Sequence, residues 1–481
     1  MGLRPDFACE RVETMELATL GAALADGIQG TFSGDLHTPG DPGYDDARMV
    51  VNTMIDRRPA LVGRPTDEAG VQALVNLARE RDLPLAVRCG GHGVSGHGTC
   101  EGGIVIDLTG LNSIEVDPAA KIARAGGGVT WGEMDDATQR HGLAVTGGRH
   151  PGTGIGGLTL GSGSGWLERM YGLTCDSLMS ARVVLADGSL VTASPFQNED
   201  LFWGLRGGGG NFGVVTEFTY QLHDVGPMIL GGMLLYPREM ARDVMRHYRD
   251  WIEAAPREIG GAMAFISAPP HDPVPTEVQG KPMVGVILAY FGELADGDEA
   301  LRPMTEFGPP AMTMVAPMPY TGLQMMLVDA FPPEARVYFK AEFLDELTDE
   351  AIDTVIEMTA EPTSPVTQVL FQPMGGAVAD VAPDDTALPV RDAKWCYHAL
   401  TIWMPEVMGP DEVHVKWTKD LAAAMTRYAR PGIFLNFVAD EGHDRVRSSY
   451  GPHYDRLVAL KDKYDPANLF RMNQNIPPSA G

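Results

Sequence analysis

The pattern of apolar and polar residues divides this chain near residue 227. Before that point, short extended apolar runs such as 83–87 and 103–108 alternate with glycine-rich turns, which predicts small strands joined by loops. From 227 to 430, strands of period two alternate with amphipathic helices such as 238–255, without the regular spacing of βαβ units. We therefore expect an α+β protein whose second part has a largely antiparallel sheet covered by helices.

Individual elements follow from local signals. The sequence Thr-Asp-Glu at 66–68 comes after a short strand at 58–62 and has the composition of a helix N-cap with acidic residues in the first turn. An Asp-Pro pair ends a C-terminal helix at 454–464. The same reasoning predicts an N-terminal helix within 1–30, further strands at 181–185, 214–222, 283–290, 367–372 and 397–403, and further helices at 348–358 and 412–428.

The length and these shifts in pattern predict several domains. A chain of 481 residues is too long for one ordinary core, so two or three domains are expected. We expect a lead-in with an N-terminal helix at 1–57, a glycine-rich domain at 58–226, a second domain at 227–430 and a separate C-terminal segment at 431–481.

Composition and charge narrow the classes of partner. Hydrophobic residues make up 44% and charged residues 21% of the chain, the balance of an ordinary globular protein. The formal net charge of -27 would repel phosphate backbones and anionic lipid surfaces, so we expect neither nucleic acid nor a membrane as a partner. The N-terminus lacks the pattern of a signal peptide, and five cysteines, an odd number, fit reduced thiols in the cytoplasm.

Three glycine clusters of the pattern G-x-G-x-x-G are the first sign of chemistry. They begin at Gly91, Gly152 and Gly208. A dinucleotide-binding fingerprint needs a strand before the cluster and a helix after it, and the residues that follow these clusters predict no helix. One such cluster is usually a tight turn, but three in one domain indicate backbone nests around a large phosphate-containing ligand.

A zinc site is an alternative for the first cluster. Cys89, His92, His97 and Cys100 are soft ligands within one short segment, in the spacing C-x2-H-x4-H-x2-C. The residues between them include three glycines and offer no evident second shell, and a chain of this size does not need a structural metal. We therefore expect no metal and keep zinc as the alternative.

Ordered motifs at both ends of the chain match one known family. They are RCGGH at 88–92, GIGGLTLG at 154–161, YGLTCD at 171–176, DLFWGLRG at 200–207, NFGVVT at 211–216 and YDPANLF at 464–470. With them, the chain resembles the berberine-bridge-enzyme-like branch of the FAD-linked oxidases, which share the vanillyl-alcohol-oxidase or PCMH-type fold. The match covers 58–226 and 431–478. It implies a two-subdomain FAD-binding domain, to which the C-terminal segment returns, and a substrate domain at 227–430.

The resemblance also implies how FAD is held. The glycine turn would wrap the FAD pyrophosphate, and His92 would be bonded covalently to the 8α-methyl group of the isoalloxazine. Many relatives form a second bond through a cysteine, but His150 stands at that place, so we expect a single link, as in a singly linked amine oxidase of the family. The remaining cofactor contacts are expected at Arg88, Cys89, Gly90, Gly91, Gly93, Thr146, His150, Thr153, Gly154, Gly156, Gly157, Gly161, Gly213, Val214, Val215, Asn436 and Asn473.

Candidate catalytic residues lie in the segment 388–403, which resembles the central strand of the family's substrate domain. His398 falls where several relatives place Glu or Gln near the flavin, and a histidine that titrates near neutral pH suits a general base. Strand alternation puts Cys396 and His398 on one face, and Trp395 and Tyr397 on the other. We take His398, Tyr397 and Cys396 as candidates, with a packed strand histidine as the open alternative.

Departures from the family bear on the substrate. The chain has FLNF at 434–437 where the family has Tyr-x-Asn-Tyr, and Val94 stands where plant relatives carry a tyrosine. Without these hydroxyls a carbohydrate pocket is not expected, and Phe437 with Trp395 and Tyr397 favours an apolar or aromatic small molecule.

The function predicted is therefore that of a covalent-FAD oxidase. A hydride would pass from a C–O or C–N carbon to the flavin, and O2 would reoxidise it to give H2O2. Thr153 lies where the family controls oxygen access to the flavin. Its side chain is similar in size to valine and smaller than leucine, which favours an oxidase. Partners would be the small substrate and O2, and the protein would be a monomer or homodimer. The alternatives are a flavin-binding protein with degenerate catalysis and an FAD-dependent dehydrogenase that uses another acceptor.

Overall fold

The N-terminal half of the molecule is built on two small sheets. The computed structural model describes residues 6–328, 332 and 334–480. A mixed four-stranded sheet contains, in spatial order, β1 Gly34–His37, β2 Leu61–Pro65, β4 Ile104–Asp107 and β3 Leu85–Arg88. An antiparallel five-stranded sheet contains β5 Ile114–Asp117, β6 Ile122–Gly126, β10 Val214–Gln221, β8 Leu178–Val184 and β9 Leu190–Ala193. A short ribbon pairs β7 Leu143–Ala144 with β11 His223–Asp224.

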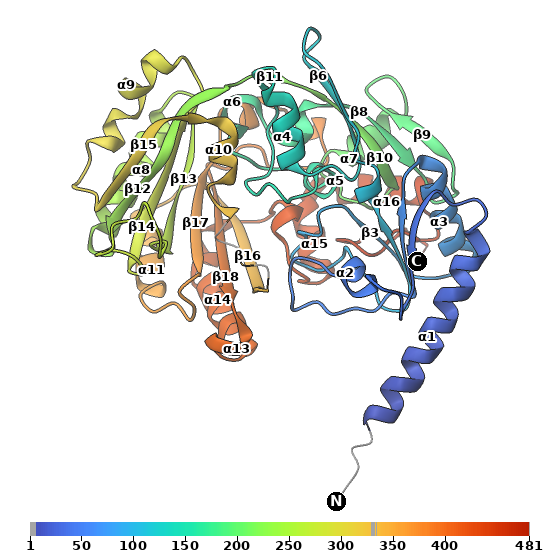
Figure 1. Ribbon diagram of the computed structural model, residues 1–481. Coiled ribbons are helices and arrows are strands. Elements are labelled where there is room, and N and C mark those ends of the chain that lie inside the picture. The colour runs from blue at the N-terminus through green and yellow to red at the C-terminus, as the bar shows by residue number, and fades with distance from the viewer. Residues whose placement is uncertain (1–5, 329–331, 333, 481) are drawn as a thin grey trace, which may run out of the picture.

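One large sheet dominates the other half. Its eight strands are antiparallel throughout. In spatial order they are β15 Met312–Pro319, β12 Met228–Pro237, β14 Pro282–Tyr290, β13 Ile259–Ser267, β17 Gln368–Pro373, β18 Trp395–Trp403, β16 Arg336–Leu344 and β19 Ala429–Arg430. The sheet stands beside the half that holds the two smaller sheets (Figure 1).

Helices fall into two sets along the chain. Those of the N-terminal half are α1 Asp6–Ile28, α2 Tyr44–Arg48, α3 Glu68–Glu80, α4 Trp131–Gln139, α5 Ile155–Leu160, α6 Glu168–Tyr171 and α7 Glu199–Leu205. Those that follow are α8 Ala241–Ala254, α9 Leu294–Thr305, α10 Tyr320–Met325, α11 Asp349–Met358, α12 Ala377–Asp380, α13 Pro405–Met408, α14 Asp411–Met425, α15 His443–Tyr450 and α16 Tyr454–Tyr464.

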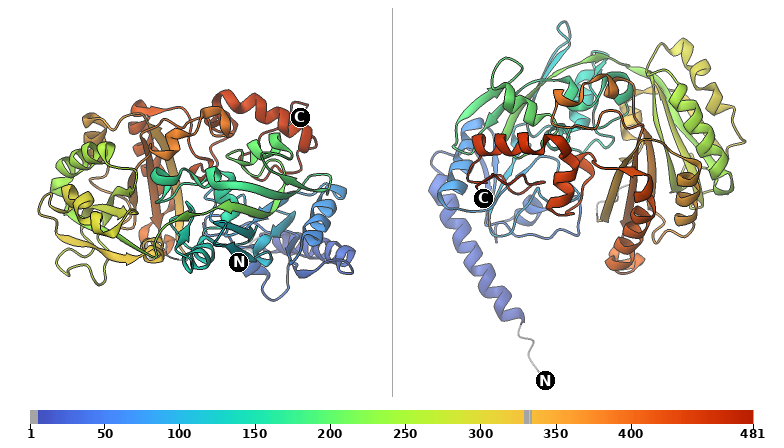
Figure 2. Two further views of the ribbon diagram at one scale, coloured as in Figure 1. Left: turned by 90° about the horizontal axis from the view of Figure 1, so that it is seen from above. Right: turned by 180° about the vertical axis from the view of Figure 1, so that it is seen from behind.

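Four helices cover the outer face of the large sheet. Helices α8, α9, α11 and α14 bury apolar side chains, among them Tyr248 and Leu421, against sheet residues such as Trp395 and Tyr397. The opposite face of the sheet turns toward the smaller sheets (Figure 2). Burial of one helix-covered face leaves the inner face free to form a site between the two halves.

The α+β architecture with a large antiparallel sheet covered by helices is confirmed. The helix predicted after Asp67 is α3, and the Asp67 side chain accepts a hydrogen bond from the Gly70 N–H (2.8 Å), as an N-cap should. The C-terminal helix has the bounds predicted for it. The domain boundaries at 57, 226 and 430 stay predictions.

Two local predictions were wrong. The early strand covers Leu61–Pro65 rather than 58–62, because it pairs in parallel with β4 from Leu61 onward. The second glycine cluster does open a helix: Gly154 is the N-cap residue of α5, and the glycines at 156 and 157 lie within its first turn. This helix has only six residues, too few for an apolar periodicity to reveal it.

Helix α1 projects from the body of the molecule (Figure 1). Leu24 and Ile28 near its C-terminal end are buried against the four-stranded sheet. Residues 1–5 of the predicted N-terminal helix lie outside the described residues. Among those described, no helix combines the length and the apolar character needed to cross a bilayer.

Candidate functional site

A cavity of about 450 Å³ lies where the halves meet. The glycine turn after β3, the loop at 148–157, the start of β10 and the C-terminal segment form one side. The inner face of the large sheet forms the other side, with Phe339, Leu370, His398 and Leu400. Residues from three of the four predicted segments, 58–226, 227–430 and 431–481, thus converge on one space.

The glycine loops fit a large phosphate-containing ligand. A Cβ added at Gly90 would lie 2.3 Å from the Gly152 carbonyl oxygen and 2.4 Å from the Gly154 nitrogen, so the loops pack backbone to backbone. Gly93 and Gly157 also line the cavity, but a Cβ there would meet no described protein atom within 4 Å. Close packing on one side and open backbone on the other suit the binding of a cofactor such as FAD.

Arg88 anchors the glycine turn to the sheet behind it. Its guanidinium donates to the buried Asp107 carboxylate (2.7 Å) and to the Met49 carbonyl (2.7 Å), and Arg64 binds the same carboxylate (2.9 Å). Burial alone would raise the pKa of Asp107, but the Arg88 charge holds it below its ordinary value. The carboxylate therefore stays ionised and fixes Arg88 in place.

His92 and His150 meet at one end of the cavity. Their ring centroids lie 4.6 Å apart, and His150 Nδ1 accepts the Gly152 N–H (3.1 Å). Burial lowers the pKa of His92 to about 4, with the nearby His150 adding to the shift, and burial also lowers the pKa of His150. Both imidazoles are therefore neutral at physiological pH, and the Nδ1 lone pair of His150 is already occupied by the Gly152 N–H.

Asn436 joins the C-terminal segment to α5. Its Nδ2 donates to the carbonyls of Gly157 (3.0 Å) and Leu158 (3.1 Å), and its Oδ1 accepts the Gly163 N–H (3.1 Å). Asn473 lines the cavity too, with its Oδ1 buried and unpartnered among the described residues. Both predicted asparagines therefore reach the site from the end of the chain.

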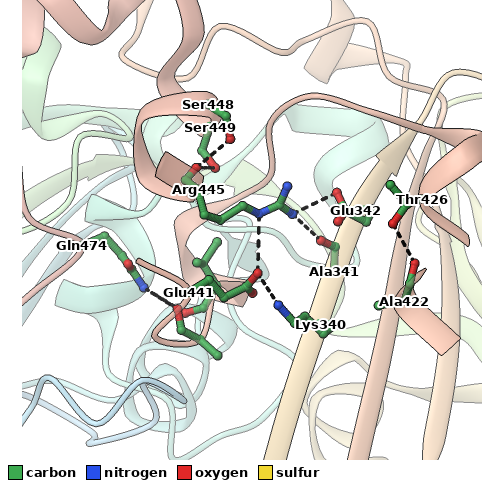
Figure 3. Close-up of polar contacts among 12 residues, drawn as sticks. Lys340, Ala341, Glu342, Ala422, Thr426, Glu441, Arg445, Ser448, Ser449 and Gln474 are labelled. Carbon is green, nitrogen blue, oxygen red and sulfur yellow. Dashed lines mark hydrogen bonds and ion pairs between the residues drawn. The ribbon is translucent and has the colours of Figure 1, made fainter. Parts of the chain in front are cut away.

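Charged side chains fasten the same segment to the large sheet (Figure 3). Glu441 forms ion pairs with Lys340 of β16 and with Arg445 of α15, and Arg445 also donates to Glu342 (2.9 Å). The amide of Gln474 donates to a backbone carbonyl of the loop that precedes α15. These contacts hold the cavity-lining loop between the two halves.

His398 lies in an aromatic environment on the inner face of β18. Its ring meets Phe339 (5.6 Å) and Phe437 (4.4 Å) edge to face, and those two phenyl rings stack on each other (5.5 Å). Nε2 is buried without a described partner. Burial lowers the pKa of His398 to about 3, and the Arg149 charge adds to the shift, so the expectation of titration near neutral pH was wrong.

The other catalytic candidates lie elsewhere. Tyr397 points to the helix-covered face, as strand alternation predicts, and packs against Phe371 in that core. Cys396 is on the same face as His398 but is buried among apolar side chains beside the cavity rather than in its wall. Of the three candidates, the structure brings His398 alone to the cavity.

Nearly all the predicted cofactor residues line the cavity. The exception is Thr146, which is fully buried and donates to the Gly172 carbonyl (2.8 Å). The wall is formed by Arg88, Cys89, Gly90, Gly91, His92, Gly93, His150, Thr153, Gly154, Gly156, Gly157, Gly161, Gly213, Val214, Val215, Asn436 and Asn473.

A polar network beside these residues was not predicted. Arg149 Nη1 donates to Ser164 Oγ (3.1 Å), and its Nη2 lies 3.7 Å from Glu168 Oε1. Gln372 of β17 donates to Ser164 (2.7 Å) and to Glu168. The sequence carried one signal, because Gln368 and Gln372 repeat polar residues on one face of an otherwise buried strand.

Three of the four residues of the zinc alternative form hydrogen bonds with different partners. Cys89 Sγ donates to the Val129 carbonyl (3.4 Å), His97 Nδ1 contacts Ser95 Oγ (2.9 Å) and Cys100 Sγ donates to the Ile104 carbonyl (3.5 Å). In the part of the chain that the structure describes, no group of three or more His, Cys, Asp or Glu side chains could hold a metal ion. In the described structure these side chains therefore do not form a cluster of metal ligands.

Two family models match the segments that form the cofactor side of the cavity. The model described as FAD binding domain matches residues 59–194. The model described as berberine and berberine like matches residues 433–477. Both matches fall within the regions that carry the glycine clusters and the C-terminal asparagines.

Full-length relatives and solved structures agree with these matches. An FAD-linked oxidoreductase of Dictyostelium discoideum is 30% identical over 434 residues, covering 89% of this chain and 90% of that protein. (R)-6-hydroxynicotine oxidase of Paenarthrobacter nicotinovorans is 29% identical over 478 residues, covering 93% and 97%. The crystal structure of 6-hydroxy-D-nicotine oxidase from Arthrobacter nicotinovorans superposes with a TM-score of 0.84 at 27% identity, covering 93% of this chain and 99% of that chain.

Proposed function

The chain belongs to the FAD-linked oxidoreductases with a berberine-like C-terminal segment, and from this premise we propose that it is an oxidase with singly tethered FAD. Its substrate is a small apolar or aromatic molecule, oxidised at a C–O or C–N carbon. When bound, the cofactor supplies the hydride acceptor and the route by which two electrons reach O2, which leaves as H2O2. The oxidoreductase class is that of the relatives; the tether, the acceptor and the substrate class are our proposal.

The position of His92 carries the proposal of a single tether. A bond to the 8α-carbon needs a free lone pair on an imidazole nitrogen, and burial keeps His92 neutral by lowering its pKa to about 4. His150 occupies the place of a second link, but its Nδ1 is held by the Gly152 N–H. We therefore assign the covalent bond to His92 alone.

The substrate side supports an apolar molecule and a buried proton acceptor. Phe339, Leu370, Leu400 and Phe437 line it. His398 is neutral among these side chains, so its ring can accept the proton that leaves the substrate oxygen or nitrogen. A buried neutral base in an apolar wall also keeps bulk water from the reacting carbon.

The tether is tested by acid precipitation of the purified holoprotein. We expect wild-type protein to stay yellow, with one flavin per chain, because a covalent bond survives unfolding. His92→Ala should release its flavin into the supernatant, whereas His150→Ala should keep it in the pellet. Loss of flavin from His150→Ala, or retention by His92→Ala, would contradict a single bond at His92.

The reaction is tested by screening alcohols and amines for peroxide release. Production of H2O2 in step with substrate loss supports an oxidase. Fast dye reduction with slow reoxidation by O2 would instead indicate a dehydrogenase that uses another acceptor. Flavin retention without turnover of any substrate would favour a flavin-binding protein with degenerate catalysis.

A further inference from the structure

The described cavity wall contains cationic side chains but no carboxylates. Among the described residues that line it, the ionisable side chains are arginines, histidines and one cysteine, and none is Asp or Glu. Burial lowers the pKa of His92 and His97 to about 4 and that of His398 to about 3, and raises the pKa of Cys89 to about 11. At neutral pH the two lining arginines therefore set the charge of the wall.

The positive charges of these two arginines are neutralised to different degrees by nearby carboxylates. Arg88 donates directly to the ionised Asp107 carboxylate at 2.7 Å. The carboxylate paired with Arg149 is Glu168 at 3.7 Å, beyond direct hydrogen-bond distance, and burial raises the pKa of Glu168 above its ordinary value. Arg149 Nε is buried without a described partner. Arg149 is thus the arginine of this wall whose guanidinium can still donate hydrogen bonds to an anion.

Arg149 belongs to the loop on the cofactor side of the cavity and reaches toward the substrate side. It donates to Ser164, which Gln372 of β17 also binds, and all three residues line the cavity, with β17 beside the strand of His398. The apolar wall that includes Phe437 and Leu370 continues from there. A small molecule seated here meets an apolar surface with one partly buried positive group, Arg149, at its border.

We propose that the substrate carries an anionic oxygen, such as a carboxylate, which Arg149 binds, and that Arg149 determines this specificity. Hydrogen bonds between ionised groups are shorter and about twice as strong as neutral ones, and more so where water is excluded. A cationic ammonium group would find no carboxylate in the described wall and would face Arg149 instead. The proposal rests on the proposed function for the side of the cavity that the substrate occupies.

The test measures binding by isothermal titration calorimetry on the holoprotein, with three probes of one shape. The probes are phenylacetate, 2-phenylacetamide and phenethylamine, which are anionic, neutral and cationic at pH 7. We expect phenylacetate to bind about tenfold more tightly than the amide, the difference between a charged and a neutral hydrogen-bonded pair, and the amine to bind most weakly.

Variants show whether Arg149 is responsible. Arg149→Gln should bring the affinity ratio of acid to amide close to one, whereas Arg149→Lys should retain a preference for the acid. The matched control is Arg169→Gln, because Arg169 is a buried arginine but donates to the Ala255 carbonyl and does not line the cavity. This control should keep the wild-type ratio.

Several results would overturn the proposal. One is a wild-type protein that binds the amide or the amine as tightly as the acid, a measurement that needs no variant. Another is an Arg149→Gln variant that changes the flavin absorbance spectrum but keeps the preference for the acid, which would assign Arg149 to the cofactor. Because the readout is heat of binding, failure here is separate from failure of flavin tethering or peroxide release.

Discussion

His398 shows how one residue position combines a predictable and an unpredictable property. Its face of the strand follows from alternation, and the structure places it in the cavity wall. Its ionisation does not follow from the sequence, because the desolvation comes from Phe339 and Phe437, which lie on other segments. The residue type indicated a group that titrates near neutral pH, whereas burial lowers the pKa of His398 to about 3 and keeps its ring unprotonated at neutral pH.

We expect His398→Gln to slow reduction of the flavin by substrate about 10²- to 10⁴-fold, the usual contribution of a general base. Because the pKa of His398 is about 3, the wild-type rate should show no histidine ionisation between pH 5 and 8 and should fall only as the pH approaches 3. Stopped-flow absorbance across this range is the measurement.

The control for this variant is His271→Gln, since His271 is exposed. An ionisation near pH 6.5 that is present in wild-type protein and lost in His398→Gln would contradict the neutral state assigned here. Unchanged flavin reduction in His398→Gln would remove the base assignment altogether.

Arg149 was not predicted, although it directly precedes His150. An arginine in a glycine-rich loop gives no local sign of burial. Its partners Ser164 and Glu168 come from a later loop and from α6, and Gln372 of β17 binds both of them, so the network exists only after the two halves have met. Contacts of this kind are tertiary and leave no periodic trace in the sequence.

At the scale of elements, the long periodic segments were predictable, whereas one short helix and the bounds of a short strand were not. Helix α16 has the bounds predicted for it, and β14, β17 and β18 lie within two residues of the predicted strands. Helix α5 was missed because its stability comes from elsewhere: its carbonyls at 157 and 158 bind Asn436 from the far end of the chain. Tertiary partners decided the structure where local propensity was weak.

Gly90 and Gly157 both line the cavity, but we expect Gly90 to matter for stability and Gly157 for cofactor binding. In a His92→Ala background, which by the proposed single tether holds no covalent flavin, Gly90→Ala should destabilise the apoprotein because its Cβ would lie 2.3 Å from a backbone oxygen. Gly157→Ala should leave apoprotein stability unchanged or raise it by about 0.5–1 kcal/mol, since alanine favours a helix, yet weaken FAD binding by filling open space. Urea denaturation and flavin titration give the two readouts.

Equal effects of the two substitutions on apoprotein stability would contradict this division. Unchanged FAD affinity in the Gly157→Ala protein would show that the open space beside α5 is not used by the cofactor.

For the whole molecule, the change in pattern near residue 227 was sufficient to predict the architecture. It indicated small strands joined by glycine loops followed by a helix-covered antiparallel sheet, and both are present. How the halves face each other was not predictable, because it depends on partners far apart in sequence, such as Lys340 with Glu441. The cavity and its electrostatics arise from that orientation.

Buried neutral histidines should make the molecule sensitive to acid. The pKa of His97 is about 4 and that of His398 about 3, whereas an unfolded histidine has a pKa of about 6.5. Below pH 6.5 these histidines bind protons in the unfolded state but not in the folded state. The free energy of unfolding therefore falls as the pH falls toward 4. Replacing either residue by Gln should reduce the slope of unfolding free energy by about 1.4 kcal/mol per pH unit.

The measurement is urea denaturation of wild-type, His97→Gln and His398→Gln proteins between pH 6 and pH 4. His271→Gln serves as the control and should follow the wild-type curve, because its ring is exposed. Parallel curves for all four proteins would mean that these histidines take up protons as readily in the folded state as in the unfolded state.

The return of the C-terminal segment to the cofactor side sets the order of events during synthesis. Ribosomes deliver the chain from its N-terminus, and domains generally fold in that order. Asn436, Asn473 and Gln474 all contribute to the cavity wall, so this wall stays open while the preceding residues are already outside the ribosome. The core of the N-terminal half also includes Leu457 and Leu460 of α16, so both this core and a closed flavin site are complete only after nearly the whole described chain has been made. We therefore expect the cofactor to bind only after nearly all of the described residues have been synthesised.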